Sequence, residues 1–177
     1  KGKEIISKYV EQTLSIFYDL LSNRNTFIYE EGLYAISALI CATNTDDSYI
    51  ELFTPNTFER LMNEFVFQAL KSGNEGVINA ACLLIGNLFR FLSGKIPTLN
   101  NYIHNIFNTL VGLIMNNKEM RSIHPFILRA IANIFNFTKE GDESILQLEV
   151  PFRDLLTKIY DVSHELDITN KNDTEYG

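Results

Sequence analysis

The sequence predicts an all-α chain built from stacked pairs of antiparallel helices. Glycine and proline are sparse, with nine and four occurrences in 177 residues. Between them, apolar residues recur with a helical period over stretches of about 15 to 20 residues, too long for strands. In addition, similar helical segments return along the chain at a nearly constant interval. Together these patterns favour a repeat array over a single compact domain.

Seven helices are expected, and the chemistry of their ends supports several of them. The hydroxyl of Thr57 can cap the third helix, and Gly94 provides a C-terminal stop for the fourth. Pro97 and Pro151 stand at helix starts, where a missing N–H is harmless. Pro125 is tolerable because it lies in the first turn of the sixth helix. The expected helices cover residues 3–21, 28–42, 57–71, 75–92, 97–115, 123–138 and 151–163, with a short turn at 143–148.

The internal repeat decides the predicted architecture. The segment "EGLYAISALICA" begins at Glu31 and "EGVINAACLLIGNLF" begins at Glu75, 44 residues later, while "GNLF" at 86–89 returns as "ANIF" at 132–135, 46 residues later. Helix pairs at this spacing are typical of HEAT or armadillo arrays. Because two helices cannot bury their own apolar surface, the pairs must stack. The sequence therefore predicts an α-solenoid of about 3.5 repeats, at 1–44, 45–93, 94–140 and an outer helix at 141–164, followed by a polar, loose tail at 165–177.

The fourth helix is apolar over most of its circumference, which indicates that it lies between neighbouring helices. Its more polar line is expected to form an exposed edge. The members of this line are Asn79, Leu83, Asn87 and Arg90.

Composition narrows the classes of partner. The net charge is −7, which disfavours nucleic acid because its binding depends on neutralising phosphates, although an acidic balance also simply favours solubility. Cys41 and Cys82 lie in apolar runs and are predicted to be buried, reduced thiols in a cytosolic or nuclear protein. We expect no membrane span and no signal peptide. The chain starts in a helical pattern without Met, and we interpret it as a fragment of a longer protein.

Catalytic, cofactor and metal sites are not predicted. His104, His124 and His164 are isolated and lack metal-ligand spacing. The segment "SGKIPT" at 93–98 lacks the first glycine of a phosphate-binding loop. Two triplets, beginning at Asn136 and Asn172, match the glycosylation pattern only formally, because nothing suggests secretion. A binding protein is therefore expected, not an enzyme.

An ordered run of residues resembles the importin-beta family of nuclear import receptors. The run is "FQALKSGNEGVINAACLLIGNLFRFLSGKIPTLNNYIHNIFNTLVGLIMNNKEMRSIHPFILRAIANIF" at 67–135, and "EEGLYAISALI" upstream also fits. The resemblance covers roughly residues 5–159. This stretch is similar to the central-to-C-terminal repeats of the family. The chain departs from the family's Gly-Asp pattern at Gly86–Asn87 and again at Ala132–Asn133, so these positions lack the carboxylates that would attract a basic partner. The family's acidic loop has no counterpart here and is expected outside the chain.

The resemblance implies a concave face that binds the adaptor importin alpha or basic cargo, with release by Ran-GTP, in a protein of the cytoplasm, nucleus and nuclear pore. Acids flank that face at Glu30, Glu31, Glu75 and Glu119, and a second interpretation is that they are solvated helix starts, where acids favour the helix dipole. The predicted contact residues are Glu75, Asn79, Leu83, Asn87, Arg90, Glu119, Arg129, Asn133 and Asn136.

The resemblance also implies a pocket on the outer helices for the Phe-Gly repeats of nucleoporins, with Phe67, Val111 and Met115 as its residues. A second interpretation is that these side chains only contact the neighbouring repeat. The alternative function is a HEAT-repeat scaffold that holds a protein complex together without Ran sensitivity.

Overall fold

A computed structural model describes residues 12, 14–22, 25–42, 50, 53–116, 118–138, 143–148 and 150–159. Every regular element among these residues is helical, which confirms the all-α prediction. The chain divides into two compact units, residues 1–140 and 141–177. The predicted tail at 165–177 lies outside the described residues, as do the predicted helical positions 3–11 and 160–163.

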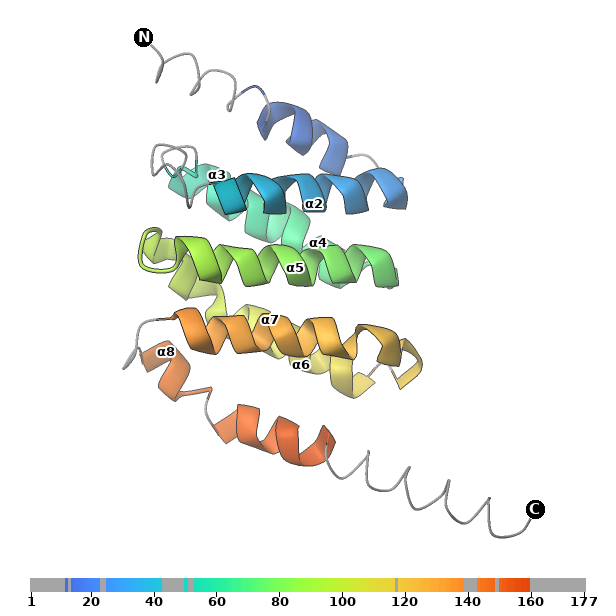
Figure 1. Cartoon of the computed structure of the whole chain (residues 1–177), viewed down its shortest axis with the longest axis vertical. Coiled ribbons are helices and arrows are strands. Elements are labelled where there is room, and N and C mark those ends of the chain that lie inside the picture. Colours follow the sequence, from blue (N-terminus) through green and yellow to red (C-terminus); the bar gives the residue numbers. More distant parts are fainter. Residues whose placement is uncertain are drawn as a thin grey trace, which may run out of the picture. The chain divides into compact units, whose positions relative to one another are not determined.

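The first unit contains a row of three long helices that lie side by side (Figure 1). They are α2 (Thr26–Ala42), α5 (Glu75–Leu92) and α7 (His124–Phe137). Helix α5 packs against α2 on one side and α7 on the other. Eleven of its residues are buried, because a helix between two neighbours has few directions left to face solvent. We call this row the inner helices.

The outer helices form a second layer behind that row (Figure 1). One runs from α3 (Pro55–Arg60) through a wide π-type turn at Leu61–Val66 into α4 (Phe67–Leu70). In that turn the Phe67 N–H donates to the Met62 carbonyl, five residues back. The next outer helix begins with a 3-10 segment (Pro97–Tyr102) and continues as α6 (Ile103–Asn116). A helix at 14–21 precedes α2.

Apolar side chains from both layers form the core of this unit. Phe58, Leu61, Phe65 and Ala69 of the outer helix are all buried. Fully burying a side chain of leucine or phenylalanine size stabilises the fold by about 1.5–3 kcal/mol. The second unit contains α8 (Glu143–Leu146) and a helix at 150–159.

The structure corrects two helix starts. The outer helix begins at Pro55, not at Thr57, and its cap is Thr54, whose Oγ1 accepts a hydrogen bond from the Thr57 N–H at 3.2 Å. By residue type, both Thr54 and Thr57 can cap a helix. Proline suits the first helical position, so Pro55 leaves Thr54 as the cap. The sixth helix starts at His124, after a 3-10 segment (Lys118–Ile123).

The prediction that no segment could cross a membrane also needs correction. By length and composition α5 could span one. However, 61% of its apolar window is buried inside the protein, and packing between two helices accounts for its apolar character equally well.

Candidate protein-binding surfaces

The exposed side chains of α2, α5 and α7 form one candidate surface, which we call the inner-helix face. On α5 the predicted edge is exposed at Leu83, at 43%, and at Arg90, and it is half-buried at Asn79 and Asn87. Glu75 is exposed as well. On α7 Arg129 and Asn136 are exposed. These residues share a side of their helices because their spacings of three, four and seven residues follow the helical period.

Two of the predicted contact residues also join the inner helices to each other. The Asn87 Nδ2 donates to the Ser37 Oγ of α2 at 2.7 Å, and Ser37 is buried. On the other side of α5, a Cβ added to Gly86 would lie only 2.6 Å from the Asn133 Nδ2. An aspartate at position 87 could not donate to Ser37, because a carboxylate only accepts, but it could accept a hydrogen bond from the Ser37 hydroxyl.

Carboxylates gather at the N-terminal ends of α2 and α5. The Glu75 Oε2 accepts from the Ser122 Oγ at 2.8 Å. The carboxylate of Glu30 lies against Gly76 in the first turn of α5, and Glu31 is exposed. Glu75 is in the first turn of α5 and the Glu30 carboxylate lies against that turn, so the positive end of the α5 dipole favours both. Glu119 falls in the segment Lys118–Ile123, and its side chain is outside the described part of the chain.

The outer helices form the second candidate surface. Phe67 is half-buried, and its ring centroid lies 6.3 Å from that of Tyr102 on the next outer helix. The Tyr102 ring is also 5.8 Å from that of Phe58, in edge-to-face geometry. Phe67 therefore takes part in the contact between neighbouring repeats. Val111 is half-buried and Met115 is 40% exposed, so Met115 is the most accessible of the three predicted pocket residues.

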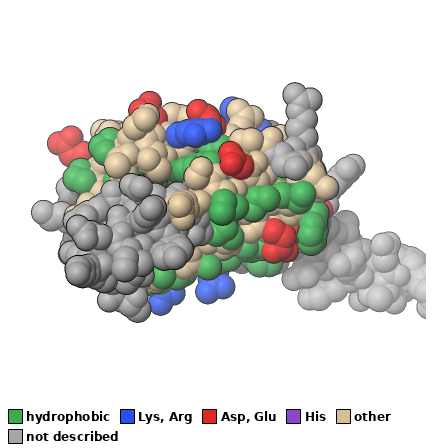
Figure 2. All heavy atoms as spheres, turned by 90° about the horizontal axis from the view of Figure 1, so that it is seen from above, with side chains coloured by type: hydrophobic (Ala, Val, Ile, Leu, Met, Phe, Trp, Pro, Cys, Tyr) green, Lys and Arg blue, Asp and Glu red, His purple; other side chains and the backbone are tan. Residues whose placement is uncertain are grey.

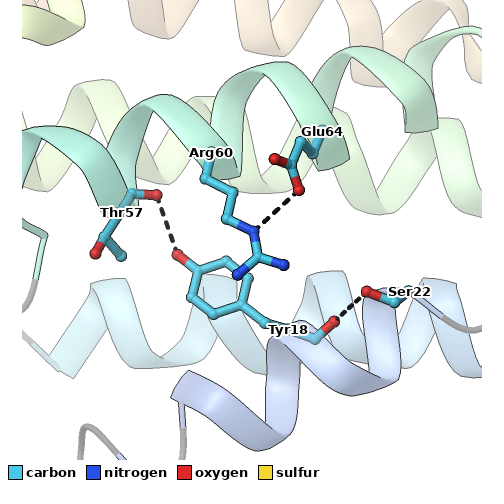
Figure 3. Close-up of polar contacts among 5 residues, drawn as sticks. All are labelled: Tyr18, Ser22, Thr57, Arg60 and Glu64. Atoms are coloured by element: carbon cyan, nitrogen blue, oxygen red, sulfur yellow. Dashed lines mark hydrogen bonds and ion pairs between the residues drawn. The ribbon is translucent and has the colours of Figure 1, made fainter.

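A group of polar contacts that the sequence did not predict links the first helix, at 14–21, to α3 (Figure 3). The Tyr18 hydroxyl donates to the Thr57 carbonyl at 3.1 Å. The Arg60 guanidinium stands 5.1 Å above the Tyr18 ring, and its Nε lies 2.9 Å from the Glu64 Oε2. Burial raises the pKa of Tyr18 to about 12, against the opposing effect of the Arg60 charge. Only the Arg60–Glu64 spacing of four residues was readable in the sequence.

Exposed apolar residues mark the end of the first unit that carries the first helix. Ile16, Leu20 and Phe27 are 57%, 37% and 67% exposed. Figure 2 looks onto this end and shows patches of hydrophobic side chains between charged ones. Single exposed apolar residues are normal, but adjoining ones are typical of surfaces that contact another protein element.

Metal and glycosylation motifs find no support in the described part of the chain. No group of three or more His, Cys, Asp or Glu residues there could hold a metal ion. His104 is half-buried on α6 and His124 begins α7, while His164 lies outside the described residues. Asn136 lies within α7, and the Thr138 of its triplet is buried, with its hydroxyl donating to the Ile134 carbonyl at 2.7 Å.

Comparison with known proteins adds one family. The family model described as "Importin subunit beta-1-like, TPR repeats" matches residues 1–150, which include both candidate surfaces. No curated protein and no solved structure matches the chain. TPR and HEAT repeats are both stacked helix pairs, and the spacing of 44 to 46 residues is closer to that of HEAT repeats.

Proposed function

Because the chain belongs to the importin subunit beta-1-like family, we propose that it is part of a nuclear transport receptor that acts by binding proteins and not by catalysis. The family match over residues 1–150 carries this proposal. The stacked helices support it, since such arrays present long surfaces to protein partners. The corresponding location is the cytoplasm, the nucleus and the nuclear pore.

The proposed partner of the inner-helix face is the adaptor importin alpha or a basic cargo protein. Glu31 and Glu75 are exposed at one end of this face, and the whole chain carries a net charge of −7. Exposed carboxylates steer a basic partner and speed its association. Asn79, Leu83 and Asn136 would add polar and apolar contacts beside them.

The proposed partner of the outer surface is the Phe-Gly repeat of nucleoporins. Met115 would be the accessible apolar contact, with Val111 beside it and Phe67 contributing the part of its ring that Tyr102 leaves uncovered. Such a contact buries little area, so its affinity would be low and its exchange fast.

Release by Ran-GTP separates this proposal from the alternative of a non-transport scaffold. The test is fluorescence anisotropy of a labelled basic adaptor segment titrated with the chain, followed by addition of Ran-GTP. We expect binding that weakens as ionic strength rises and is reversed by Ran-GTP but not by Ran-GDP. Binding that ignores Ran-GTP would favour the scaffold. Absence of binding to both the adaptor segment and a Phe-Gly peptide would contradict the proposal.

A further inference from the structure

The buried side chains of the outer helix that contains α3 and α4 repeat with a period of four residues. All of them are at most 4% exposed, and they form two series, Phe58, Met62, Val66 and Leu70, and Leu61, Phe65 and Ala69. An α-helix has 3.6 residues per turn, so each step of four residues turns about 40° too far. A strip with this period therefore drifts around an unbroken α-helix and leaves its buried side.

Leu70 shows the size of this mismatch. In an unbroken α-helix it would stand about 120° around the axis from Phe58 and within about 20° of Glu59. However, Leu70 and Phe58 are both fully buried, whereas Glu59 is exposed. The two halves of the helix are therefore rotated relative to an α-helix, and the π-type turn at Leu61–Val66 lies between them.

One main-chain hydrogen bond shows how much the turn adds. The Phe67 N–H donates to the Met62 carbonyl, five residues back, where an α-helix uses the carbonyl four residues back. If one residue between Met62 and Phe65 were removed, the same two groups would be four residues apart, and their bond would be an α-helical one. The removal would also place Leu70 within about 20° of Phe58 in an unbroken α-helix. The turn thus contains one residue more than the buried pattern requires.

Tyrosine hydroxyls hold the helix before the turn and within it. The Tyr18 hydroxyl of the first helix donates to the Thr57 carbonyl at 3.1 Å (Figure 3). The Tyr29 hydroxyl of α2 donates to the Phe65 carbonyl, inside the turn, at 2.7 Å. Rotation of either half of the helix would break one of these bonds and expose buried apolar side chains.

We propose that the π-type turn is a register device: the outer helix is an α-helix with one inserted residue, and the turn absorbs that residue so that α3 and α4 keep their buried sides toward the stack. Most π-helices are single turns of this kind within α-helices. The inference goes beyond the proposed function and does not depend on it. It predicts that the chain tolerates the loss of a residue in the middle of this helix.

Single-residue deletions in two outer helices test the proposal. Deletion of Asn63, which is exposed in the turn, should leave the midpoint of thermal unfolding within about 3 °C of the parent chain, because both halves of the helix stay in register. Deletion of Asn108, which is exposed on α6, should lower the midpoint by about 10 °C or more, since it turns the buried Leu110 and Ile114 about 100° away from the core. Circular dichroism melting measures both.

Two substitutions separate the loss of a side chain from the loss of a residue. Asn63→Ala removes the amide that hydrogen-bonds the Tyr102 side chain, and Asn108→Ala is its counterpart on α6. Each should leave the midpoint within about 3 °C. Hydrogen exchange followed by NMR gives a second readout. In the Asn63 deletion, the Phe67 amide should be at least as protected as in the parent chain, because its bond to Met62 becomes α-helical.

A fall in the midpoint after deletion of Asn63 as large as that after deletion of Asn108 would overturn the inference. Failure of the Asn63 deletion to fold, while Asn63→Ala folds, would do the same. Tolerance of both deletions would also contradict it, because the buried pattern would then not decide which deletion is accepted. Loss of protection at the Phe67 amide would show that the turn does not convert to an α-helix.

Discussion

Single side chains hold the inner helices together through a small number of polar contacts. Ser37 of α2 contacts Asn87 of α5, and Ser122, in the 3-10 segment before α7, contacts Glu75 of α5. The two bonds differ in surroundings, since Ser37 is 1% exposed and Ser122 is exposed. A buried polar group without a partner costs far more than a solvated one. Replacing each serine in turn therefore compares the free-energy contribution of a buried hydrogen bond with that of an exposed one.

We expect Ser37→Ala to lower the free energy of unfolding by about 1 kcal/mol, because it removes the acceptor of the Asn87 amide in a buried place. Ser122→Ala should change it by less than about 0.5 kcal/mol, since water can replace the lost donor at the surface. Urea unfolding followed by circular dichroism measures both. Equal losses in the two variants would contradict this account.

Buried tyrosine hydroxyls should make the fold sensitive to alkaline pH. Burial raises the pKa of Tyr29 and of Tyr18 from 10.0 to about 12. Between these values the folded chain holds protons that the unfolded chain has lost, so stability is fully present below pH 10 and falls as the pH rises toward 12. Tyr29→Phe should make this fall shallower in unfolding experiments at a series of pH values, whereas an unchanged pH profile would argue against it.

At the scale of elements, a side-chain cap marks where α3 and α5 begin. Asn74 caps α5, with its Oδ1 accepting from the Val77 N–H at 3.0 Å, and Thr54 caps α3 in the same way. Gly73 and Gly94 take positive φ values of 70° and 78° in the turns on either side of α5, a conformation that glycine adopts without strain. These turns allow successive helices to fold back on one another.

The cap of α3 can be tested with a neighbouring threonine as control. Thr54→Ala should lower the free energy of unfolding by about 1 kcal/mol, because the Thr57 N–H loses its acceptor. Thr57→Ala should cost less than about 0.5 kcal/mol, since it removes only the exposed hydroxyl that accepts from the Thr54 Oγ1 at 2.9 Å and leaves the Thr57 N–H and carbonyl in place. The reverse order of the two effects in urea unfolding would restore Thr57 as the cap.

At the scale of the molecule, the first unit depends on contact between successive repeats. Helix α5 packs against both other inner helices, so it contributes to two boundaries at once. Stability in such arrays is close to a sum over repeats and the interfaces between neighbours. Damage inside α5 should therefore weaken the entire unit.

Two adjacent leucines of α5 differ in burial, so they allow the interior of the stack to be compared with its surface. Leu84 is fully buried and Leu83 is 43% exposed. Leu84→Ala should lower the free energy of unfolding by about 2–5 kcal/mol, through lost burial and the cavity left behind. Leu83→Ala should cost less than about 1 kcal/mol. Similar costs for both, by urea unfolding, would contradict the placement of α5 between its neighbours.

The sequence alone determined the helical class, the repeat spacing and the exposure of Leu83 and Arg90 on α5, because helical periodicity and repetition are local properties of a chain. It also supported the family that the comparison confirmed. Only the tertiary structure decided which predicted surface residues are engaged inside the stack. Tyr18 reaches a partner 39 residues away and Asn87 one 50 residues away, and the alignment of packed helices, which no local pattern encodes, selects these partners.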